Sequence, residues 1–297
     1  MIERNLITFL TMVGEGNTVK CAEKLHLTQP AVTQHLHTLE ETYGAKLFIK
    51  AGRKLTLTEK GKLFYDMVHR LYTMEQQITY RMQTMPQTPI RFGATRSINA
   101  GVMPYIMADF LDRFSDRPVE MTVQNTSVLL SYLEKGKIDF ALLEGNFDHS
   151  KYESHAFMNA DFVGLCKSGG KYSHCESLKD TFSAPLLLRE PGSGSRDILE
   201  KTLQARGYDL YHFQGIYQFE SIPVILELVK KDFGITFAYK QGAKKEIEQG
   251  DIAVLNESVL HLYRQFWFVT LPSSPFLDES LEVLAYLQQL VEKYLQQ

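Results

Sequence analysis

Cysteines are few and long apolar runs are missing from this chain of 297 residues. Its three cysteines, Cys21, Cys166 and Cys175, are odd in number and scattered, which argues against a disulfide framework and for reduced thiols in a cytosol. No apolar stretch approaches the roughly 20 residues that a membrane-spanning helix needs. The N-terminal residues lack the charged-then-apolar pattern of a signal peptide. We therefore expect a cytoplasmic protein with no membrane partner.

Signatures of catalysis are also missing. The segment Gly192–Ser195 superficially looks like a nucleophile elbow, but no serine in it has a glycine two positions away on both sides. The chain has no P-loop, no HExxH pattern and no dinucleotide-binding glycine pattern after Gly93. His174 and Cys175 together with Cys166 are too few ligands for a recognised zinc site. The sequence thus predicts neither an enzyme nor a metal or cofactor site.

Net charge is −3 for the whole chain, which is unusual for a DNA-binding protein, but it is unevenly distributed. Residues 1–90 carry eleven Lys and Arg against eight Asp and Glu, a balance of +3, which leaves −6 for the remainder. A basic head on an acidic body suits a protein that contacts DNA at one end and binds small ligands or copies of itself at the other.

The segment Cys21–Ile49 carries the most informative pattern. A short helix ends near Leu25, a tight turn follows, and Thr28 caps a second helix with Pro30 in its first turn. An inward apolar stripe on that helix consists of Val32, Leu36 and Leu39. Its outward face carries uncharged side chains of the kind that read base edges, namely Gln29, Thr33, Gln34 and His37. This pattern is typical of a helix-turn-helix that enters the major groove, and an ordinary helical hairpin is the alternative.

A basic hairpin is predicted directly after this helix. Gly44 ends the helical segment, and Lys46–Ile49 and Leu55–Leu57 are the predicted strands. The tip between them holds three basic side chains, Lys50, Arg53 and Lys54. We expect these side chains to contact backbone phosphates or the minor groove, and a solvated basic turn is the alternative.

These features closely resemble the signature of the LysR-type transcriptional regulators. The matching residues are Gly16, Ala22, Leu25, Leu27, Gln29–Val32, Leu39, Glu40, Gly44, Leu47, Phe48, Arg53, Leu57, Thr58 and Gly61. The likeness is continuous from about Phe9 to Gly61 and looser beyond. It departs at Thr18, where the family usually has a large apolar residue, and at Cys21, where alanine is common. The resemblance implies a winged helix-turn-helix, a long linker helix and a two-lobed effector-binding domain similar to periplasmic binding proteins.

A long helix is predicted from Thr58, which caps it. Apolar residues follow at alternating spacings of three and four, as in a coiled-coil seam: Phe64, Met67, Leu71, Met74 and Ile78. The seam slips at Arg81, and Pro86–Pro89 ends the helix in a hinge. A helix packed on its own domain is the alternative. In LysR-type regulators the linker helices pair, so the resemblance implies a homodimer or a homotetramer.

From Ile90 onward, strands and helices alternate, which predicts a largely parallel sheet with helices on both faces. The strands of the first lobe are expected at Ile90–Ala94, Val119–Gln124 and Ile138–Leu143, and its helices at Ala100–Phe114 and Ser127–Lys135. The second lobe is expected to hold strands at Pro185–Arg189, Phe213–Phe219 and Gly234–Phe237 and helices at Ser195–Arg206 and Ile222–Lys231. Gln265–Leu271 and a helix at Leu277–Tyr294 return to the first lobe. The resemblance implies crossovers near 145–165 and 260–270.

The predicted fold class is α/β, with the winged helix-turn-helix over 1–58, the linker helix and hinge over 59–89, and the effector-binding domain over 90–297. Lobe 1 takes in about 90–160 and 265–297, and lobe 2 about 161–264. Ligands of such sheets bind at strand-to-helix loops. Three loops have this position: Thr95–Ser97, Asn125–Ser127 and Arg189–Arg196.

In LysR-type regulators the inducer is held at loops that match these three. The expected effector-binding residues are Thr95, Arg96, Ser97, Thr126, Ser127, Gly192, Ser193, Gly194 and Glu220. The alternative is that the hydroxyls only cap helices. Arg96 and the serine-rich loop favour an anionic effector, whereas Glu190 and Glu220 would argue against one if they face the cleft.

The whole sequence therefore predicts a homo-oligomeric regulator that binds double-stranded DNA and is switched by a small-molecule effector, with RNA polymerase as a further partner. Two alternatives stay open: a solute-binding module without specific DNA binding, and a ligand-independent DNA-binding regulator.

Overall fold

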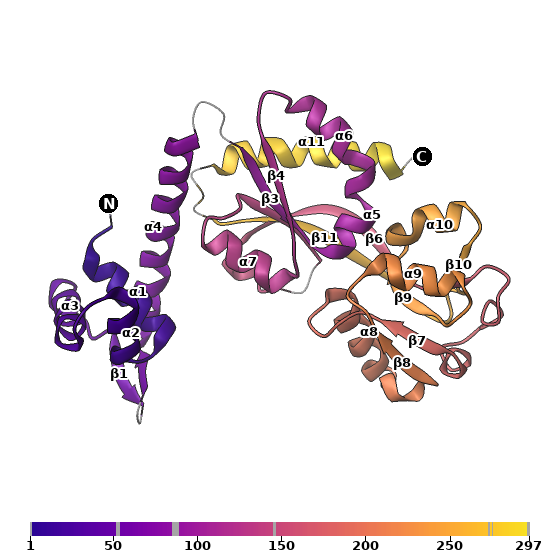
Figure 1. Ribbon diagram of the computed structural model, residues 1–297, viewed down its shortest axis with the longest axis horizontal. Helices are drawn as coiled ribbons and strands as arrows, with labels where there is room; N and C mark the ends of the chain where they lie inside the picture. Colours follow the sequence, from indigo (N-terminus) through magenta and orange to yellow (C-terminus); the bar gives the residue numbers. More distant parts are fainter. Residues whose placement is uncertain are drawn as a thin grey trace. The chain divides into compact units, whose positions relative to one another are not determined.

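The computed structural model describes residues 2–51, 54–84, 89–144, 147–272, 274 and 276–295 (Figure 1). The chain divides into two compact units, one of Met1–Met85 with Glu134–Gly136 and the other of Pro86–Leu133 with Lys137–Gln297. Each unit has its own hydrophobic core.

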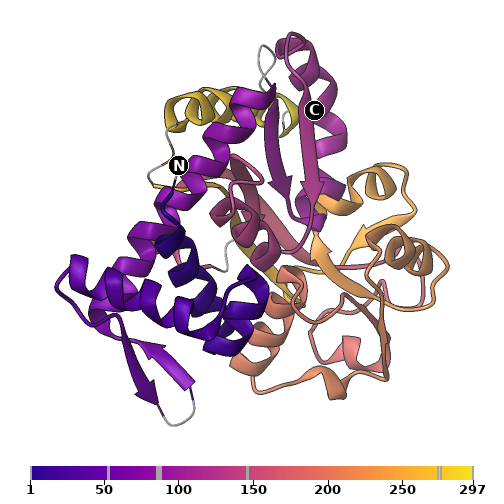
Figure 2. The ribbon, with the colours of Figure 1, turned by 60° about the vertical axis from the view of Figure 1, so that its left-hand side comes forward.

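The first unit combines helices with one hairpin (Figure 2). Its elements are α1 (Arg4–Glu15), α2 (Thr18–Leu25), α3 (Gln29–Thr42), β1 (Phe48–Ala51), β2 (Lys54–Leu57) and α4 (Glu59–Thr84). Helices α1, α2 and α3 enclose a core around Phe9, Met12 and Val32, whose side chains are fully buried. The predicted helix-turn-helix, wing hairpin and long helix are all present.

Local signals explain where these helices begin and end. His26 takes a left-handed conformation, with φ of 52°, and ends α2. The Thr28 hydroxyl accepts a hydrogen bond from the Ala31 amide at 3.3 Å and caps α3, as predicted. Thr58 caps α4 in the same way, since its hydroxyl accepts from the Gly61 amide at 2.8 Å. A side chain at Gly61 would collide with the Leu47 carbonyl, so glycine lets α4 approach the strand.

The second unit alternates strands with helices. Its strands are β3 (Ile90–Ala94), β4 (Val119–Val123), β5 (Phe140–Glu144), β6 (Glu153–Lys167), β7 (Pro185–Leu188), β8 (Gly215–Gln218), β9 (Thr236–Tyr239), β10 (Ile252–Val254) and β11 (His261–Thr270). Its helices are α5 (Arg96–Gly101), α6 (Met103–Arg113), α7 (Thr126–Glu134), α8 (Gly194–Ala205), α9 (Ile222–Lys230), α10 (Lys244–Glu248) and α11 (Leu277–Leu295). The unit has two lobes: the first lobe around β3, β4 and β5, and the second lobe around β7, β8 and β9 (Figure 1).

One sheet runs through both lobes in the order β10-β6-β11-β5-β3-β4, with β9 also paired to β6. Strand β3 is parallel to β4 and β5. The long strands β6 and β11 are antiparallel to each other and pass from one lobe to the other (Figure 1). The predicted largely parallel sheet was therefore wrong for the part of the sheet formed by β6, β9, β10 and β11.

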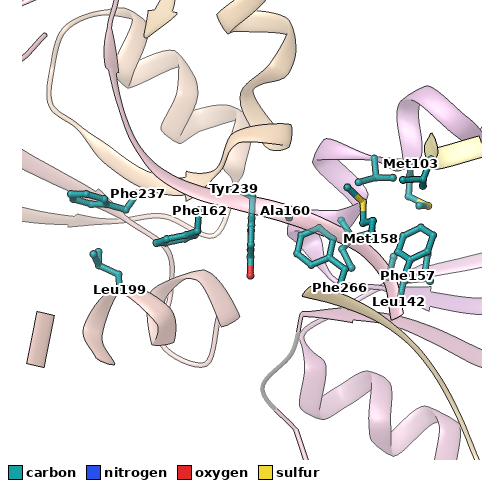
Figure 3. Close-up of a cluster of buried hydrophobic side chains, with 14 of the residues drawn as sticks. Met103, Leu142, Phe157, Met158, Ala160, Phe162, Leu199, Phe237, Tyr239 and Phe266 are labelled. Carbon is teal, nitrogen blue, oxygen red and sulfur yellow. The ribbon is translucent and has the colours of Figure 1, made fainter. Parts of the chain in front are cut away.

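Alternating side chains of β5 explain why helices cover both faces of the first lobe. Phe140 and Leu142 belong to the core that includes residues of α6 and α11, whereas Ala141 and Leu143 pack with Leu129 of α7. The larger core continues along β6 into the second lobe, from Phe157 and Met158 past Ala160 to Phe162, Leu199 and Phe237 (Figure 3).

The helix expected at Ala100–Phe114 is two helices in the structure. Helix α5 ends at Gly101, and Val102 interrupts the path with φ of −123° before α6 begins at Met103. A side chain at Gly101 would lie within 2.8 Å of the Gln241 and Gly242 backbone, so this glycine allows the two lobes to meet closely.

Candidate functional site

The outward face of α3 is exposed as predicted. Thr28, Gln29, Pro30, Thr33, Gln34 and His37 all lie at the surface. Five of them, all except Thr28, line one shallow hollow. The opposite face of α3 is buried through Val32, Leu36 and Leu39. The helix therefore presents a continuous polar surface to solvent while its opposite face packs in the core.

Hydrogen bonds already engage part of this surface. The Gln29 amide donates to the Thr18 hydroxyl at 2.9 Å, and His37 Nδ1 lies 3.2 Å from the Glu41 carboxylate. The Gln34 side chain makes no hydrogen bond within the described part of the chain. Gln34 is therefore the polar side chain of this surface with both its donor and its acceptor available.

Glu40 fixes α3 to the hairpin. Its carboxylate accepts from the amides of Leu47 and Phe48 at 2.9 and 3.4 Å and from Lys46 Nζ at 2.5 Å. Burial raises the pKa of Glu40, but these hydrogen bonds outweigh burial and the pKa is lowered overall. The carboxylate thus stays charged and holds the hairpin beside the exposed helix.

The hairpin tip is only partly described. Lys50 and Lys54 lie in β1 and β2, and their side chains are not described. Arg53 lies outside the described residues, as do residues 86–88 of the predicted hinge. The proposed contacts of these basic side chains therefore rest on the sequence.

Helix α4 carries a stripe of exposed apolar side chains. Leu63, Met67, Leu71, Ile78 and Met82 are each about half or more exposed. Met74 is half-buried. Phe64, which was predicted to belong to the seam, packs instead on its own unit, with ring centroids 5.0 Å from Phe9 and 4.7 Å from Tyr43. Leu63 takes the place on the stripe that the sequence spacing assigned to Phe64.

In the second unit, most of the predicted effector-binding residues converge on one small cavity between the lobes. Its lining includes Thr95, Arg96, Ser97, Asn125, Thr126, Glu144, Arg189, Ser193 and Gly194. Ser127 does not line it, and its hydroxyl bonds the Asn125 side chain at 3.0 Å. Gly192 also lies outside it and takes a left-handed turn with φ of 82°.

Glu220 lines a second, larger hollow, of about 660 Å³, next to the small cavity. Apolar side chains such as Met103, Tyr105 and Ile222 line the same hollow. Arg96 belongs to both cavities, so the two are continuous at its side chain.

An ion-pair network closes the cleft across the lobes. Arg96 Nη1 of the first lobe lies 2.5 Å from Glu190 Oε1 of the second, and Arg189 donates to both oxygens of Glu190 at 2.8 and 2.9 Å. Burial raises the pKa of Glu190, but the bonds from Arg189 and the charge of Arg96 lower it overall. Glu190 therefore faces the cleft as a charged carboxylate, and Arg96 is already paired.

Glu144 is the cleft residue that sequence reasoning missed. It ends β5, is 4% exposed, and lies so close to Gly194 that a Cβ there would be 2.7 Å from its Oε2. Oε2 has no hydrogen-bond partner among the described residues. Burial raises the pKa of Glu144, and the nearby Ser97, Thr95 and Arg189 oppose that shift only in part. Its position at the carboxyl end of a buried strand was the available signal.

The described residues contain no helix long and apolar enough to cross a membrane, and no group of three or more His, Cys, Asp or Glu that could hold a metal ion. All three cysteines are buried and free. Burial raises the pKa of Cys166 to about 11, so that thiol is protonated at neutral pH.

Comparisons with known proteins agree with this arrangement. Residues 4–62 match the family model described as a bacterial regulatory helix-turn-helix protein of the lysR family, and residues 83–292 match the LysR substrate binding domain. The HTH-type transcriptional regulator YofA of Bacillus subtilis is 25% identical over 289 residues, which cover 94% of this chain and 98% of YofA. An uncharacterized HTH-type transcriptional regulator, MJ0300 of Methanocaldococcus jannaschii, is 22% identical over 88% of this chain and 90% of its own.

The fold also matches solved structures. The full-length LysG of Corynebacterium glutamicum, with bound effector Arg, aligns with a TM-score of 0.63 at 15% identity, covering 97% of this chain and 98% of LysG. The family models together span most of the chain and fall on the helix-turn-helix and on the two-lobed unit that the structure describes. The chain therefore belongs to the LysR family of DNA-binding transcriptional regulators, with an N-terminal helix-turn-helix and a C-terminal effector-binding domain.

Proposed function

We propose that α3 reads operator DNA from the major groove with Gln34 at the centre of the contact. The observation that carries this proposal is the hollow on α3, which is lined by the four predicted base-reading residues and by Pro30. Thr28 orients the first turn of the helix as its cap. Lys50, Arg53 and Lys54 of the wing add sequence-independent contacts to phosphates.

The apolar stripe of α4 joins two copies of this chain. The exposed side chains from Leu63 to Met82, together with the half-buried Met74, follow one another at spacings of three or four and are what a coiled-coil partner would cover. Pairing places two reading heads on one roughly palindromic site, as a homodimer or as half of a homotetramer. RNA polymerase is a further partner for a regulator of transcription, and the chain acts in the cytoplasm, where the bacterial chromosome lies.

We expect Leu71→Asp to weaken self-association, because a carboxylate would be desolvated inside the seam. Leu71 is 53% exposed within one chain, so the substitution leaves the chain's own core intact. The matched control is Gln76→Asp, which adds the same charge at an exposed position off the stripe. Sedimentation velocity decides: an unchanged oligomer in Leu71→Asp removes α4 from the interface.

The cleft takes a small anionic effector. Two guanidinium groups, Arg96 and Arg189, face it together with the hydroxyls of Thr95, Ser97 and Ser193. The first turns of α7 and α8 also begin here, and helix N-termini favour negative charge. The charged Glu190 competes for the same guanidiniums, so an anion that enters must replace Glu190 at Arg96.

The effector switches the regulator by preferring one arrangement of the lobes, because a ligand shifts an equilibrium only by its differential affinity. In this proposal residues 1–58 bind DNA, and residues 59–89 form the helix that pairs with a second copy and the hinge after it. Residues 90–297 bind the effector. Lobe 1 (about 90–160 and 265–297) and lobe 2 (about 161–264) close on the ligand.

A two-step experiment tests the proposed function. Selection of DNA sites from a random pool should give one enriched palindromic motif, and a thermal-shift screen of metabolite anions should give ligands that raise the melting temperature. Those ligands should then change affinity for the selected site. A ligand without a DNA motif would indicate a solute-binding module, and a motif insensitive to every cleft ligand would indicate a ligand-independent regulator.

A further inference from the structure

Glu144 is a buried carboxyl group in the cleft with an oxygen that has no partner among the described residues. We propose that Glu144 binds the effector as a neutral carboxylic acid that donates a hydrogen bond to an oxyanion oxygen, so that effector binding takes up a proton. This inference rests on the proposed anionic effector of the cleft and adds a specificity-determining residue and a pH dependence to it.

Polar groups from both lobes surround Glu144 without satisfying it. Thr95 Oγ1 from the first lobe and the Tyr239 hydroxyl from the end of β9 are also buried and have no hydrogen-bond partner in the described part of the chain. Thr95 and Tyr239 lie close enough to Glu144 to lower its pKa by hydrogen bonding, yet none of the three atoms makes a well-formed hydrogen bond, so together they form a buried polar cluster that a ligand oxygen could complete. Thr95 and Glu144 line the small cavity, and Tyr239 lines a further small cavity that shares Ser97 and Arg189 with it.

The net charge around the cavity depends on whether Glu144 is ionised, and an anion binds more easily where this net charge is less negative. Arg96 and Arg189 contribute two positive charges, and Glu190 contributes one negative charge. Glu220, which is exposed and lies 3.4 Å from Arg96, adds a second negative charge. These five groups sum to −1 if Glu144 is ionised and to zero if it is neutral, so the cavity repels an anion less when Glu144 is neutral.

Burial and the groups around Glu144 act on its pKa in opposite directions: hydrogen bonding by Ser97, Thr95 and Tyr239 and the charge of Arg189 lower the pKa, and burial raises it by more. Ser97 on α5 and Gly194 on α8 carry no charge, and Tyr239 on β9 is held protonated because burial raises its pKa. Arg189, after β7, is the cation that faces Glu144, and it also binds both oxygens of Glu190. Burial outweighs Arg189 and raises the pKa of Glu144.

The proton balance is simple. At a pH where Glu144 is ionised in the free protein, one proton passes from solvent to its carboxylate for each anion bound, and no covalent bond changes. Affinity then falls with rising pH by at most about tenfold per unit, because one proton is linked to one ligand. At a pH where Glu144 is already neutral, affinity is independent of pH.

Titration calorimetry on the full-length chain tests the coupling, with sulfate as the probe because sulfate does not titrate between about pH 6 and about pH 9. Acetate, also fully ionised there, tests whether a carboxylate serves equally. Chloride at matched ionic strength is the control for screening. Measurement in buffers with different ionisation enthalpies counts the protons taken up.

We expect wild type to bind an oxyanion more weakly at high pH and to take up a fraction of a proton that approaches one. Glu144→Gln should keep the low-pH affinity within about threefold, because the amide is neutral and still donates, and its binding should be flat with pH and free of proton uptake. Glu282→Gln is the matched control. It also removes a carboxylate from this unit, but Glu282 is exposed on α11 and does not line the cavity, so the wild-type pH dependence should remain.

A second measurement needs no ligand. Because the folded-state pKa of Glu144 is raised, the stability that its carboxyl contributes is present below the unfolded pKa and is lost as pH rises through the folded pKa. Glu144→Gln should therefore raise the melting temperature relative to wild type more at about pH 9 than at about pH 5. An equal difference at both pH values would contradict a raised pKa and with it the proposal.

Three outcomes of the binding experiment separate the possibilities. Sulfate or acetate binding that is flat with pH and takes up no proton, over a pH range in which the ligand-free melting temperatures show Glu144 becoming ionised, overturns the role of Glu144 and leaves the anionic cleft standing. A loss of more than about tenfold in Glu144→Gln at low pH overturns it too, because a neutral hydrogen-bond donor at this position would then not be sufficient. No oxyanion binding by any folded variant overturns the anionic effector itself, and this inference falls with it.

Discussion

The outward face of α3, which we propose reads DNA and call the reading face, and the cleft proposed for the effector are built in opposite ways. The reading face consists of six residues within Thr28–His37, on or beside a single helix, and all of them are exposed. The cleft gathers residues as far apart in sequence as Thr95, Glu144 and Ser193, and those three are buried. A contiguous motif fixes the first site through helix periodicity, whereas the second exists only once two lobes have packed together.

The two sites also differ in how their polar groups are used. On α3 the Thr28 hydroxyl caps its helix, and Gln34 is left exposed to solvent. In the cleft, guanidiniums and carboxylates pair with one another across the lobes, while Ser193 stands at the N-cap of α8 without capping it. A ligand of the cleft must compete with ion pairs of the protein itself, whereas a ligand that bonds Gln34 on α3 competes only with water.

The largest expected effect concerns a buried ion pair of the first lobe, at the amino ends of β3 and β5. Asp139 accepts from Arg91 Nη2 at 2.7 Å, and both side chains are almost fully buried in the first lobe. We expect Asp139→Ala to lower the free energy of unfolding by about 3–5 kcal/mol, because it removes the carboxylate that faces a buried guanidinium. Urea unfolding followed by fluorescence of Trp267, the single tryptophan, reports this unit.

Asp109→Ala is the matched control, because its ion pair with Lys293 is exposed at both ends. That variant should lose less than about 1 kcal/mol. Equal losses in the two variants would mean that the buried pair stabilises the unit no more than a surface pair does.

The next effect separates response from DNA affinity. Ser193 is 4% exposed at the cleft, and its hydroxyl lies 2.9 Å from that of Ser195. Ser193→Val should weaken the effector response by about 1.5–3 kcal/mol, or about tenfold or more in midpoint, through loss of a hydrogen bond to a charged ligand group. Basal DNA affinity should stay close to normal.

Effector titration into protein–DNA complexes measures both quantities. Thr202→Val, on the same helix but bonded to the Ile198 carbonyl, is the control and should respond like wild type. A normal midpoint in Ser193→Val would move the effector out of this cleft, and a parallel loss of basal binding would mean a damaged fold.

A smaller effect is expected at the reading face. Gln34→Ala should cost about 1–3 kcal/mol at the selected site and relax base preference at one position. Arg53→Ala should weaken specific and random DNA alike and reduce the salt dependence of binding. If Gln34→Ala also weakened both kinds of DNA equally, Gln34 would be a backbone contact.

The difference between the sites explains how far the sequence could predict them. The α3 cap, its buried stripe and its polar face follow from local spacing, and the structure places them where the spacing did. Phe64 fits the α4 seam by spacing as well as Leu63 does, and only the packing of Phe9 and Tyr43 draws it inward. The local sequence pattern cannot predict which of two adjacent apolar residues is exposed when this depends on packing against a neighbouring element.

Contacts between residues far apart in the sequence were even harder to predict from the sequence. The break between α5 and α6 at Val102 accompanies the approach of Gly101 to Gln241, which is distant in sequence. Glu144 directly follows the buried strand predicted at Ile138–Leu143. No local sequence pattern indicated that it would lie beside Gly194 of the other lobe. The strand-to-helix loops were predictable because their position is a rule of the fold class, but their partners were not.

The smallest effect tests the contrast between the two N-caps directly. Thr28→Ala removes a side-chain cap that accepts from Ala31, so we expect a loss of about 1 kcal/mol in the stability of the DNA-binding unit. Ser193→Ala removes a hydroxyl that makes no cap hydrogen bond and loses only its neutral hydrogen bond with the Ser195 hydroxyl, so the effector-binding unit should lose about 0.5 kcal/mol. Far-ultraviolet circular dichroism and Trp267 fluorescence during urea unfolding measure the two units. A loss in Ser193→Ala as large as that in Thr28→Ala would show that the Ser193 hydroxyl stabilises the fold and is not available to bind a ligand.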